Sequence, residues 1–221
     1  MFTSSLKPMA KVLLTGFEPF GGELVNPSWQ AVTLLAERRT SLITVELPCA
    51  FATSLSTLRT AIGLHQPDLV VCVGQAGGRS DVTPERVAVN LTDARIPDNA
   101  NAQPIDVPVV PGGPVGYFST LPVKACVAAI REAGIPASVS HTAGTFVCNQ
   151  VFYGLMHLLA TEFPGIRGGF VHVPYSPEQV AAAGSTAPSL SIDKCADALG
   201  VLVDTALTVE EDLHVTAGAL H

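Results

Sequence analysis

Charged residues are scarce in this sequence, and basic residues are fewer than acidic ones. Only 14% of the 221 residues are Asp, Glu, Lys or Arg, and the 12 basic residues are scattered along a chain whose net charge is −7. A protein that tracks nucleic-acid phosphates needs clustered Lys and Arg side chains. The composition therefore argues against nucleic acid as a partner.

Long apolar runs are also missing, although 48% of the residues are hydrophobic. No stretch approaches the roughly 18 uncharged apolar residues that a membrane-spanning helix needs. Residues 1–10 contain one lysine and no apolar run, which is unlike a secretory signal. We therefore expect a protein with a sizeable core that works in the cytoplasm and not in a membrane.

Paired cysteine motifs are the third absence. The cysteines are five in number and widely spaced, without a C-x-x-C pair or a zinc-like spacing. They are Cys49, Cys72, Cys126, Cys148 and Cys195. This usage predicts free thiols in a reducing compartment and gives no reason to expect a metal.

Short apolar runs alternate with helical patterns throughout the chain. The runs that predict strands cover residues 11–15, 42–47, 68–73, 85–90, 135–139 and 169–173. The patterns that predict helices cover 26–39, 52–65, 121–133, 147–162 and 189–213. Such alternation predicts an α/β fold, a mainly parallel twisted sheet with helices on both faces. We expect one catalytic domain over residues 1–221, with 1–8 as a loose N-terminal extension and 214–221 as a frayed tail.

Glycine-rich or irregular loops follow several of these predicted strands. They cover residues 16–22, 74–79, 142–145 and the segment from 173 onward. The carboxyl ends of parallel strands open on a functional crevice, so we expect these loops to converge there. The loop at 74–79 lacks the G-x-G-x-x-G spacing and the G-K-[ST] ending of phosphate cradles. Its glycines instead indicate close approach of the backbone to a ligand.

The stretch S-H-T-A-G-T-F-V-C-N at 140–149 has the pattern of a strand–turn–helix elbow. A helical stripe begins at about Val147, which places Cys148 in the first turn of a helix. The free backbone N–H groups and the helix dipole there favour a thiolate and predict a lowered pKa for that cysteine. Cys148 is therefore a candidate nucleophile, and a buried inert cysteine is the alternative.

A thiolate nucleophile needs a histidine base, and two histidines compete for that role. His172 lies near the carboxyl end of a predicted strand, just before Pro174. His141 lies seven residues before Cys148 and could also reach it. His157 is nine residues past Cys148 on the same helix, which points it to the opposite face. The residues alone favour His172 but leave His141, or neither histidine, open.

The base in turn needs an orienting carboxylate. Glu85 is the best candidate, because it begins a predicted strand soon after the glycine-rich loop. A strand-end charge paired with Arg86 is the simpler alternative. Asp93, Asp98 and Glu18 are weaker rivals.

Several segments together match a known family. They are L-L-T-G-F-E-P-F-G-G at 13–22, N-P-S-W at 26–29, C-V-G-Q-A-G-G-R at 72–79, T-P-E-R-V-A-V-N at 83–90, A-R-I-P-D-N at 94–99, the stretch at 140–149, R-G-G-F-V-H-V-P at 167–174 and A-P-S-L at 187–190. With these segments in this order, the chain resembles the pyroglutamyl peptidase I (pyrrolidone-carboxylate peptidase) family from residue 11 to about residue 213. Members are cysteine peptidases that remove an N-terminal pyroglutamyl residue from peptides.

The resemblance implies a catalytic triad of Cys148, His172 and Glu85. It also implies a pocket for the pyroglutamyl ring and polar groups beside it, formed by Phe17, Phe20, Asn26, Gln75, Arg95, Ile96, Phe146 and Val147. It implies no metal and no cofactor, and a homotetramer is expected because relatives often form one. One departure is Cys49, where the family pattern leads us to expect Thr or a small aliphatic residue. A second thiol would then lie near the pocket.

Two functions of other classes remain as alternatives. A phosphate-dependent nucleoside phosphorylase uses a similar α/β sheet, and its turnover would depend on phosphate. A non-catalytic binding module is the third interpretation, and a burst of reaction with a thiol reagent would argue against it.

Overall fold

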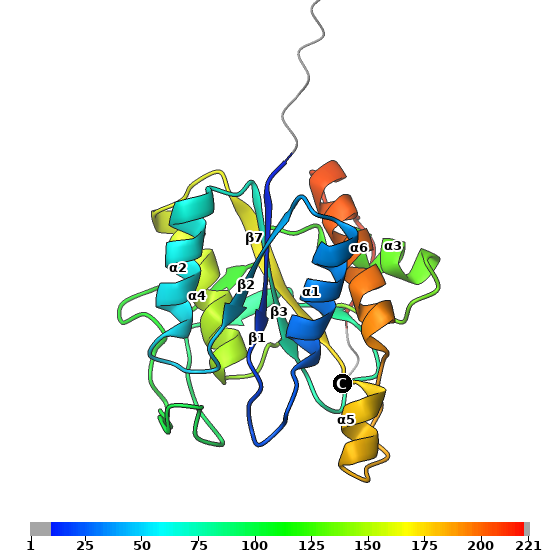
Figure 1. Cartoon of the computed structure of the whole chain (residues 1–221). Coiled ribbons are helices and arrows are strands. Elements are labelled where there is room, and N and C mark those ends of the chain that lie inside the picture. Colours follow the sequence, from blue (N-terminus) through cyan, green and yellow to red (C-terminus); the bar gives the residue numbers. More distant parts are fainter. Residues whose placement is uncertain (1–9, 219–221) are drawn as a thin grey trace, which may run out of the picture.

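A five-stranded sheet runs through the centre of the computed structural model, which describes residues 10–218 (Figure 1). Its strand order is β2 (Leu42–Leu47), β1 (Val12–Phe17), β3 (Leu69–Gln75), β7 (Arg167–Val173) and β4 (Thr83–Pro84). The first four of these strands are parallel, and β4 is antiparallel to β7. The prediction of a mainly parallel sheet is confirmed.

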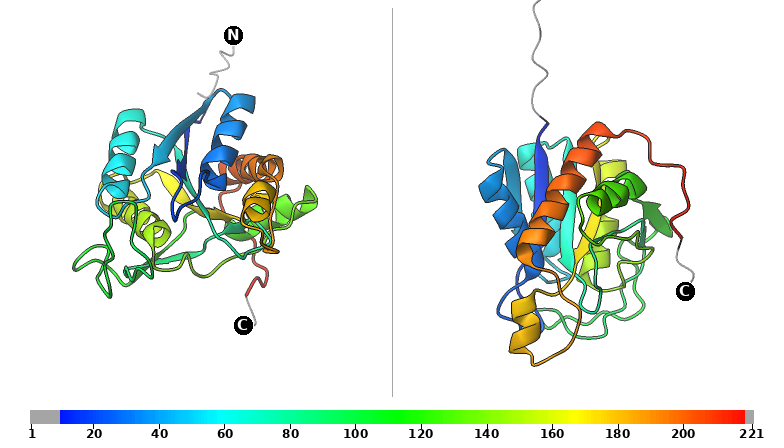
Figure 2. Two further views of the ribbon diagram at one scale, coloured as in Figure 1. Left: turned by 60° about the horizontal axis from the view of Figure 1, so that its bottom comes forward. Right: turned by 90° about the vertical axis from the view of Figure 1, so that its right-hand side faces the viewer.

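Helices cover both faces of this sheet. One face carries α1 (Pro27–Arg38), α3 (Val123–Glu132) and α6 (Ile192–Thr208). The other carries α2 (Ser54–His65) and α4 (Val147–Thr161). The two groups lie on opposite sides of the strands in Figures 1 and 2, and the short α5 (Pro177–Ala182) follows β7 at the carboxyl edge. The layers form the predicted α/β/α sandwich.

The sequence explains the buried strands and the helix starts. β1, β3 and β7 have strands on both sides and helices on both faces, so nearly all of their residues are buried and apolar. Asn26 caps α1, because its Oδ1 accepts a hydrogen bond from the N–H of Ser28 at 3.0 Å and Pro27 occupies the first turn. Ser191 caps α6 by accepting from the N–H of Lys194. These local signals set where the elements begin.

The predicted strand at 135–139 is wrong as a continuous element. Within the described residues this stretch makes a single isolated bridge, between Ala137 and Val82. Pro136 has no N–H, which removes a donor from a regular ladder. The bridge between Ser140 and Glu85 nevertheless holds the segment before the elbow beside that carboxylate.

The predicted strand at 85–90 is shorter than expected and lies outside the main sheet. Only its middle forms a strand, β5 (Val87–Val89), which pairs with β6 (Gly116–Phe118) in an antiparallel two-stranded sheet, whereas β4 of the main sheet ends just before it. Glu85 lies between the two, at the point where the chain leaves the main sheet. The last helix was predicted for 189–213, but α6 is shorter at both ends. Its capping residue is Ser191, and the chain after Thr208 is irregular.

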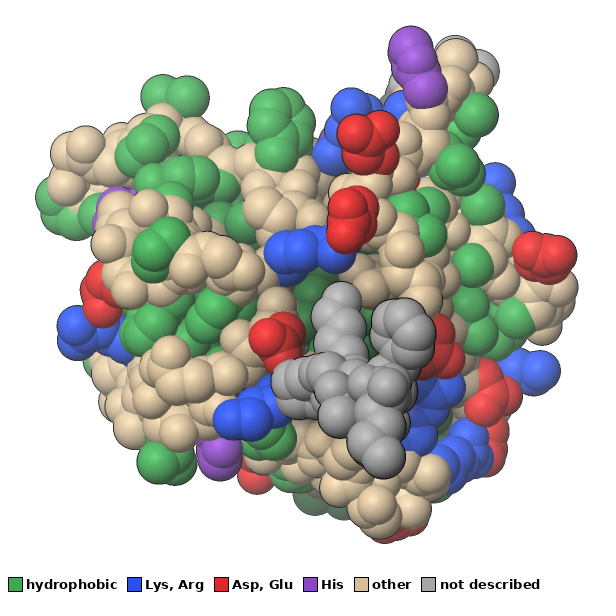
Figure 3. Space-filling view, turned by 90° about the horizontal axis from the view of Figure 1, so that it is seen from above, with side chains coloured by type: hydrophobic (Ala, Val, Ile, Leu, Met, Phe, Trp, Pro, Cys, Tyr) green, Lys and Arg blue, Asp and Glu red, His purple; other side chains and the backbone are tan. Residues whose placement is uncertain are grey.

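The ends of the chain and the surface complete the description. The expected loose extension at 1–8 and the last three residues of the expected tail lie outside the described residues. No helix within residues 10–218 is long and apolar enough to cross a membrane. Seen from the end at which β1 begins, basic and acidic side chains are interspersed on the surface (Figure 3). On this face the basic side chains are as scattered as they are in the sequence.

Candidate active site

Cys148 is the second residue of α4, which begins at Val147 as predicted. The residue before the helix, Phe146, is extended and offers no side-chain cap. The backbone N–H groups of the first turn therefore have no capping side chain. The rest of α4 is almost fully buried between the sheet and α2, which fixes the position of its start.

Gly74 leaves the space that the Cys148 thiol occupies. A β-carbon at Gly74 would lie 2.9 Å from Sγ of Cys148 and 2.8 Å from Cζ of Phe170, closer than real side chains approach. Gly74 is also the register partner of His172 across β3 and β7. The thiol is thus held against the strand pair that carries the histidine. Two of the loop glycines make room for side chains of the protein itself, Gly74 for the thiol and Gly77 for an aromatic ring, whereas Gly78 has open space beside it.

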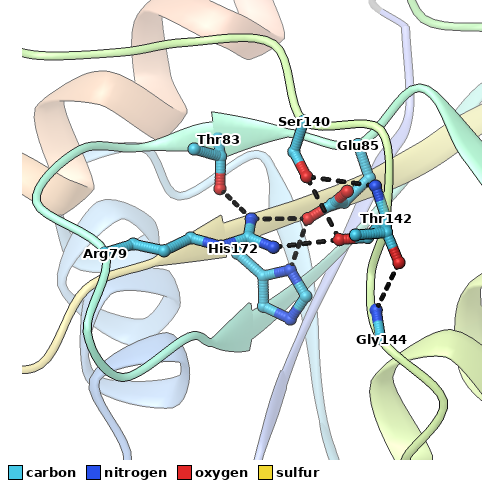
Figure 4. Close-up of polar contacts among 7 residues, drawn as sticks. All are labelled: Arg79, Thr83, Glu85, Ser140, Thr142, Gly144 and His172. Atoms are coloured by element: carbon cyan, nitrogen blue, oxygen red, sulfur yellow. Dashed lines mark hydrogen bonds and ion pairs between the residues drawn. The ribbon is translucent and has the colours of Figure 1, made fainter. Parts of the chain in front are cut away.

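His172 and Glu85 form a buried pair beside this thiol. Nδ1 of His172 lies 2.7 Å from Oε1 of Glu85, and the side chains are 4% and 0% exposed. The N–H of Glu85 donates to the carbonyl of Phe170 at 2.8 Å, which fixes the acid against β7. Nε2 lies on the other side of the imidazole ring (Figure 4). It is therefore the nitrogen left to exchange a proton with a partner.

Arg79 is a site residue that the sequence interpretation did not identify. Its Nη1 lies 2.7 Å from the same Oε1 of Glu85 that His172 uses and also contacts the hydroxyl of Thr83 (Figure 4). Its Nη2 donates to the carbonyl of Thr142 at 2.9 Å. A signal was present, because Arg79 ends the glycine-rich loop at the same sheet edge as Glu85, and a buried carboxylate needs a compensating cation.

The buried pair holds a neutral imidazole beside an ionised carboxylate. Burial lowers the pKa of His172; Glu85 raises it through their hydrogen bond and charge, Arg79 lowers it, and the net direction is downward. Burial acts to raise the pKa of Glu85, but His172 and Arg79 outweigh it and hold that pKa below its ordinary value. At neutral pH the imidazole can therefore accept a proton.

The pKa of Cys148 is raised, which is opposite to the prediction from its place in the helix. Burial is the main cause, the nearby Cys49 and Glu85 add to it, and Arg79 offsets part of it. A helix start stabilises a thiolate through a few N–H groups, whereas loss of water removes the solvation of the whole anion. The resting site thus holds a neutral thiol, and a thiolate needs a base to take its proton.

The apolar residues expected in the ring pocket share one cluster with Cys49. They are Phe17, Phe20, Phe146 and Val147. Phe51, which the sequence interpretation did not include, contacts Phe146 edge to face with ring centroids 5.3 Å apart. Phe20 lies against the same ring at 6.2 Å. Phe51 follows Cys49 at the end of β2, so its position at the carboxyl edge was the available signal.

Asn26 and Gln75, the two amide side chains expected beside the pocket, differ in the hydrogen-bonding groups that they leave available for a ligand. Oδ1 of Asn26 accepts from the N–H and hydroxyl of Ser28, and its Nδ2 donates to the carbonyl of Glu18. Oε1 of Gln75 accepts from Nε2 of Gln179 at 3.0 Å. Asn26 therefore shapes the loop after β1, whereas Gln75 keeps its own amide NH₂ as a donor for a ligand.

Arg95 and Ile96 are exposed, and Ile96 is 38% exposed. Their loop is joined to the turn before α4 by two hydrogen bonds. The N–H of Asp93 donates to the carbonyl of Thr145 at 3.0 Å, and the hydroxyl of Thr145 donates to the carbonyl of Asp93 at 2.8 Å. The loop therefore lies beside the start of α4, at the rim of the site.

The rival residues have other positions. His141 is exposed, and Nδ1 of His157 lies 2.9 Å from the hydroxyl of Tyr117. The carboxylates of Glu18 and Asp98 each accept a backbone N–H from the segment after β2, so they hold loops in place. The structure brings Cys148, His172 and Glu85 together and leaves these rivals outside.

Fold and site define a cysteine-dependent hydrolase of α/β class, because the carboxyl edge of the sheet gathers a thiol, an imidazole and a carboxylate in the order that nucleophilic catalysis uses. The sequence profile of one family, pyroglutamyl peptidase, matches residues 10–209. The chain belongs to the pyroglutamyl peptidase family, as the resemblance of its motifs indicated.

Relatives and solved structures extend over nearly the whole chain. A pyrrolidone-carboxylate peptidase of Streptomyces coelicolor is 62% identical over 218 residues, which cover 96% of this chain and 100% of the relative. One from Erwinia tasmaniensis is 57% identical over 216 residues, with coverage of 96% and 100%. The crystal structure of pyroglutamyl peptidase I from Bacillus amyloliquefaciens superposes with a TM-score of 0.90 at 51% identity, covering 94% of this chain and 99% of that one. Pyrrolidone carboxyl peptidase from Thermococcus litoralis gives a TM-score of 0.88 at 35% identity, with coverage of 94% and 100%.

Proposed function

We propose that this chain is a cysteine peptidase that hydrolyses the amide bond after an N-terminal pyroglutamyl residue of a peptide. Family membership supports the reaction, and the contacts of Cys148, His172 and Glu85 support the mechanism. The relatives that match over 96% of the chain are named as peptidases, which favours this function over the nucleoside phosphorylase.

The reaction starts with Cys148 as the nucleophile. Its sulfur attacks the pyroglutamyl carbonyl carbon while the thiol proton passes to Nε2 of His172. The tetrahedral intermediate then collapses, the C–N bond breaks, and the leaving amine takes the proton from His172. A water molecule next attacks the thioester with His172 as base, which releases pyroglutamate and restores the thiol. Water is the only co-reactant in this sequence.

Glu85 makes His172 a better base in this scheme. By accepting from Nδ1–H, the carboxylate selects the tautomer in which Nε2 has a free lone pair. It also stabilises the imidazolium that forms when the thiol proton is transferred. Both groups are buried, so this electrostatic help is stronger than it would be in water.

The start of α4 supplies donors for the negative oxygen of the tetrahedral intermediate. The N–H of Gln150 is bonded to the carbonyl of Phe146, so the N–H groups of the three residues between them precede the first intrahelical hydrogen bond. The partial positive charge of the helix end acts in the same direction. The loop of Arg95, joined to Thr145, is a second source of donors at this position.

The aromatic cluster suits a neutral lactam. Pyroglutamate carries an uncharged five-membered ring with one N–H donor and one C=O acceptor, whereas the amine of an N-terminal proline is usually charged. An apolar pocket penalises an unpaired cation. The free NH₂ of Gln75 is a donor for the lactam carbonyl. A site built for such a hydrogen bond can reject an analogue that lacks it by about 10⁴-fold.

The buried pair of His172 and Glu85 beside the Cys148 thiol is the observation that carries this proposal. We would measure kcat/KM on matched pyroglutamyl, prolyl and glutaminyl fluorogenic amides, with and without iodoacetamide and with varied phosphate. We expect turnover of the first substrate only, independent of phosphate and abolished by iodoacetamide and by Cys148→Ala. Cys72→Ala, a buried thiol on β3, is the matched control that should keep activity. Full activity of Cys148→Ala would refute the thiol mechanism. Equal cleavage of prolyl and pyroglutamyl amides would refute a pocket specific for the lactam.

The proposal includes the setting in which the enzyme works. The five cysteines are all free in the described part of the chain, which supports a reducing cytoplasm. We propose that the chain acts as a single catalytic domain on N-terminally pyroglutamylated peptides and assembles as a homotetramer, by resemblance to the family. Light scattering on the purified protein tests the assembly, and a monomer mass at assay concentration would exclude it.

A further inference from the structure

Glu85 meets both of its charged partners within the described residues through one of its two oxygens. Oε1 accepts from Nη1 of Arg79 and from Nδ1 of His172, each at 2.7 Å. Oε2 is buried and has no hydrogen-bond partner there. The guanidinium and the imidazole therefore share one oxygen, and the charge of the acid is divided between them.

We propose that Arg79 is a positioning residue that keeps His172 available as a neutral base and holds the loop before Cys148 in place. This inference rests on the proposed function, in which His172 is the base and Cys148 the nucleophile. It depends on two sets of contacts that Arg79 makes with its two terminal nitrogens.

The first set acts on charge. A carboxylate as buried as Glu85 would, with no other cation nearby, stabilise the protonated form of His172 strongly. Arg79 supplies a permanent positive charge on that oxygen, because a guanidinium does not lose its proton in proteins. The acid then stays ionised while the imidazole stays neutral in the resting enzyme. His172 thus remains able to accept the thiol proton near neutral pH.

The second set acts on geometry. Nη2 of Arg79 donates to the carbonyl of Thr142, in the turn that leads to α4. The same turn is tied internally, because the hydroxyl of Ser140 donates to that carbonyl at 3.1 Å and the N–H of Gly144 donates to the hydroxyl of Thr142 at 3.1 Å (Figure 4). One side chain therefore connects the glycine-rich loop, the acid and the turn that positions Cys148.

Within the described residues, the charged groups that act on the imidazole of His172 are Glu85, from the segment after β4, and Arg79, from the loop after β3. The same two side chains act on the thiol of Cys148, which also has Cys49 nearby. Removal of a cation raises the pKa of every group that it faces. Loss of Arg79 should therefore raise the pKa of both His172 and Cys148.

The test compares Arg79→Met, Arg79→Lys and the control Arg86→Met, which removes the cation that follows Glu85 in the sequence. We expect the acid limb of kcat/KM for Arg79→Met to move up by about one pH unit. Its activity should fall about tenfold more at pH 6 than at pH 8. Arg79→Lys should restore the acid limb but recover less of the rate, because an ammonium cannot make the forked contact to Glu85 and Thr142. Arg86→Met should keep the wild-type profile.

A second measurement needs no turnover and separates this inference from the proposed function. The rate at which iodoacetamide alkylates Cys148, followed by mass spectrometry of its peptide, reports the thiol and imidazole directly. Its midpoint should move to higher pH in Arg79→Met, and this holds whether or not pyroglutamyl amides are substrates. Circular dichroism confirms that each variant is folded, and Arg79→Gln, which also removes the charge, replaces the methionine variant if that one is not. A uniform loss of rate with unmoved pH profiles in both measurements would show a merely structural role and overturn the inference.

Discussion

Gly74 lies opposite His172 across the β3–β7 pair, and its α-carbon lies against the thiol of Cys148. Neighbouring strands are about 4.8 Å apart, so this pairing brings the nucleophile to the histidine without a direct sequence relation between them. The glycine is required by space, since its backbone dihedral angles are open to any residue. The relationship leads to a simple test.

Gly74→Ala should displace the thiol of Cys148 or the ring of Phe170, because the new β-carbon would lie within 3 Å of both. We expect kcat/KM to fall by about 10²-fold, since small misplacements of reacting groups have such effects. The free energy of unfolding should fall by about 1–3 kcal/mol from overpacking. Gly63→Ala is the control, because Gly63 lies on α2 with open space around it. Equal activity of the two variants would contradict the packing of the thiol against β3.

Glu85→Gln should leave the fold intact and weaken His172 as a base, because an amide cannot stabilise the imidazolium. We expect kcat/KM to fall by ~10²-fold or more, as for orienting carboxylates in other triads. His172→Ala should lose nearly all activity, whereas His141→Ala should keep it, since His141 is exposed. The opposite result for the two histidine variants would show that the base is wrongly assigned.

Acid should destabilise the fold through the buried pair. The pKa of His172 is lower in the folded protein than in the unfolded chain, so the folded state binds fewer protons below pH ~6.5. Stability should therefore start to fall as the pH drops through that value. Glu85, whose folded pKa is also lowered, adds a further loss at lower pH, as the pH falls through its folded pKa.

The measurement for this prediction is the melting temperature between pH 8 and pH 5. His172→Gln should flatten the decline below pH ~6.5, because the variant has no buried imidazole to protonate. His141→Gln changes an exposed histidine and should keep the wild-type slope. Parallel curves for all three proteins would rule out His172 as the cause.

Gln179 should control the polarity of the Gln75 amide. The N–H of Ser176 donates to Oε1 of Gln179 at 3.1 Å, so the atom that Gln179 presents to Gln75 is its NH₂. Gln75 accepts this hydrogen bond with its Oε1, so its own NH₂ points away from Gln179. Gln179→Glu keeps the cap at the start of α5, because Glu serves in a capping box, but it offers only acceptors to Gln75. The Gln75 amide should then rotate so that its NH₂ faces Gln179 and its oxygen takes the place of the free donor.

The expected result is a fall in kcat/KM for pyroglutamyl amides of roughly tenfold or more, the cost of a lost and mismatched hydrogen bond. The rate of Cys148 alkylation should not change, because the thiol and His172 are untouched. Unchanged turnover in Gln179→Glu would show that the NH₂ of Gln75 does not meet the substrate.

The elements that depend on neighbours in the chain could be predicted from the sequence. The strand runs, the cap at Asn26 and the helix that starts at Val147 follow from local periodicity and turn chemistry. The preference for His172 followed from one further rule, that the ends of parallel strands meet at one edge. Glu85 was preferred because it comes soon after the glycine-rich loop at that edge. The stretch 85–90 was predicted less well, because a chain that leaves one sheet for another gives no local signal.

The sequence by itself determined the four parallel strands, the main helices and the placing of a cysteine at a helix start. Only the tertiary structure decided that Arg79 shares the oxygen of Glu85 and that Gly74 makes room for the thiol. It also decided that the pKa of Cys148 rises instead of falling. These three features depend on the removal of water and on groups far apart in the chain. Desolvation and through-space charge act on distances that the order of residues does not contain.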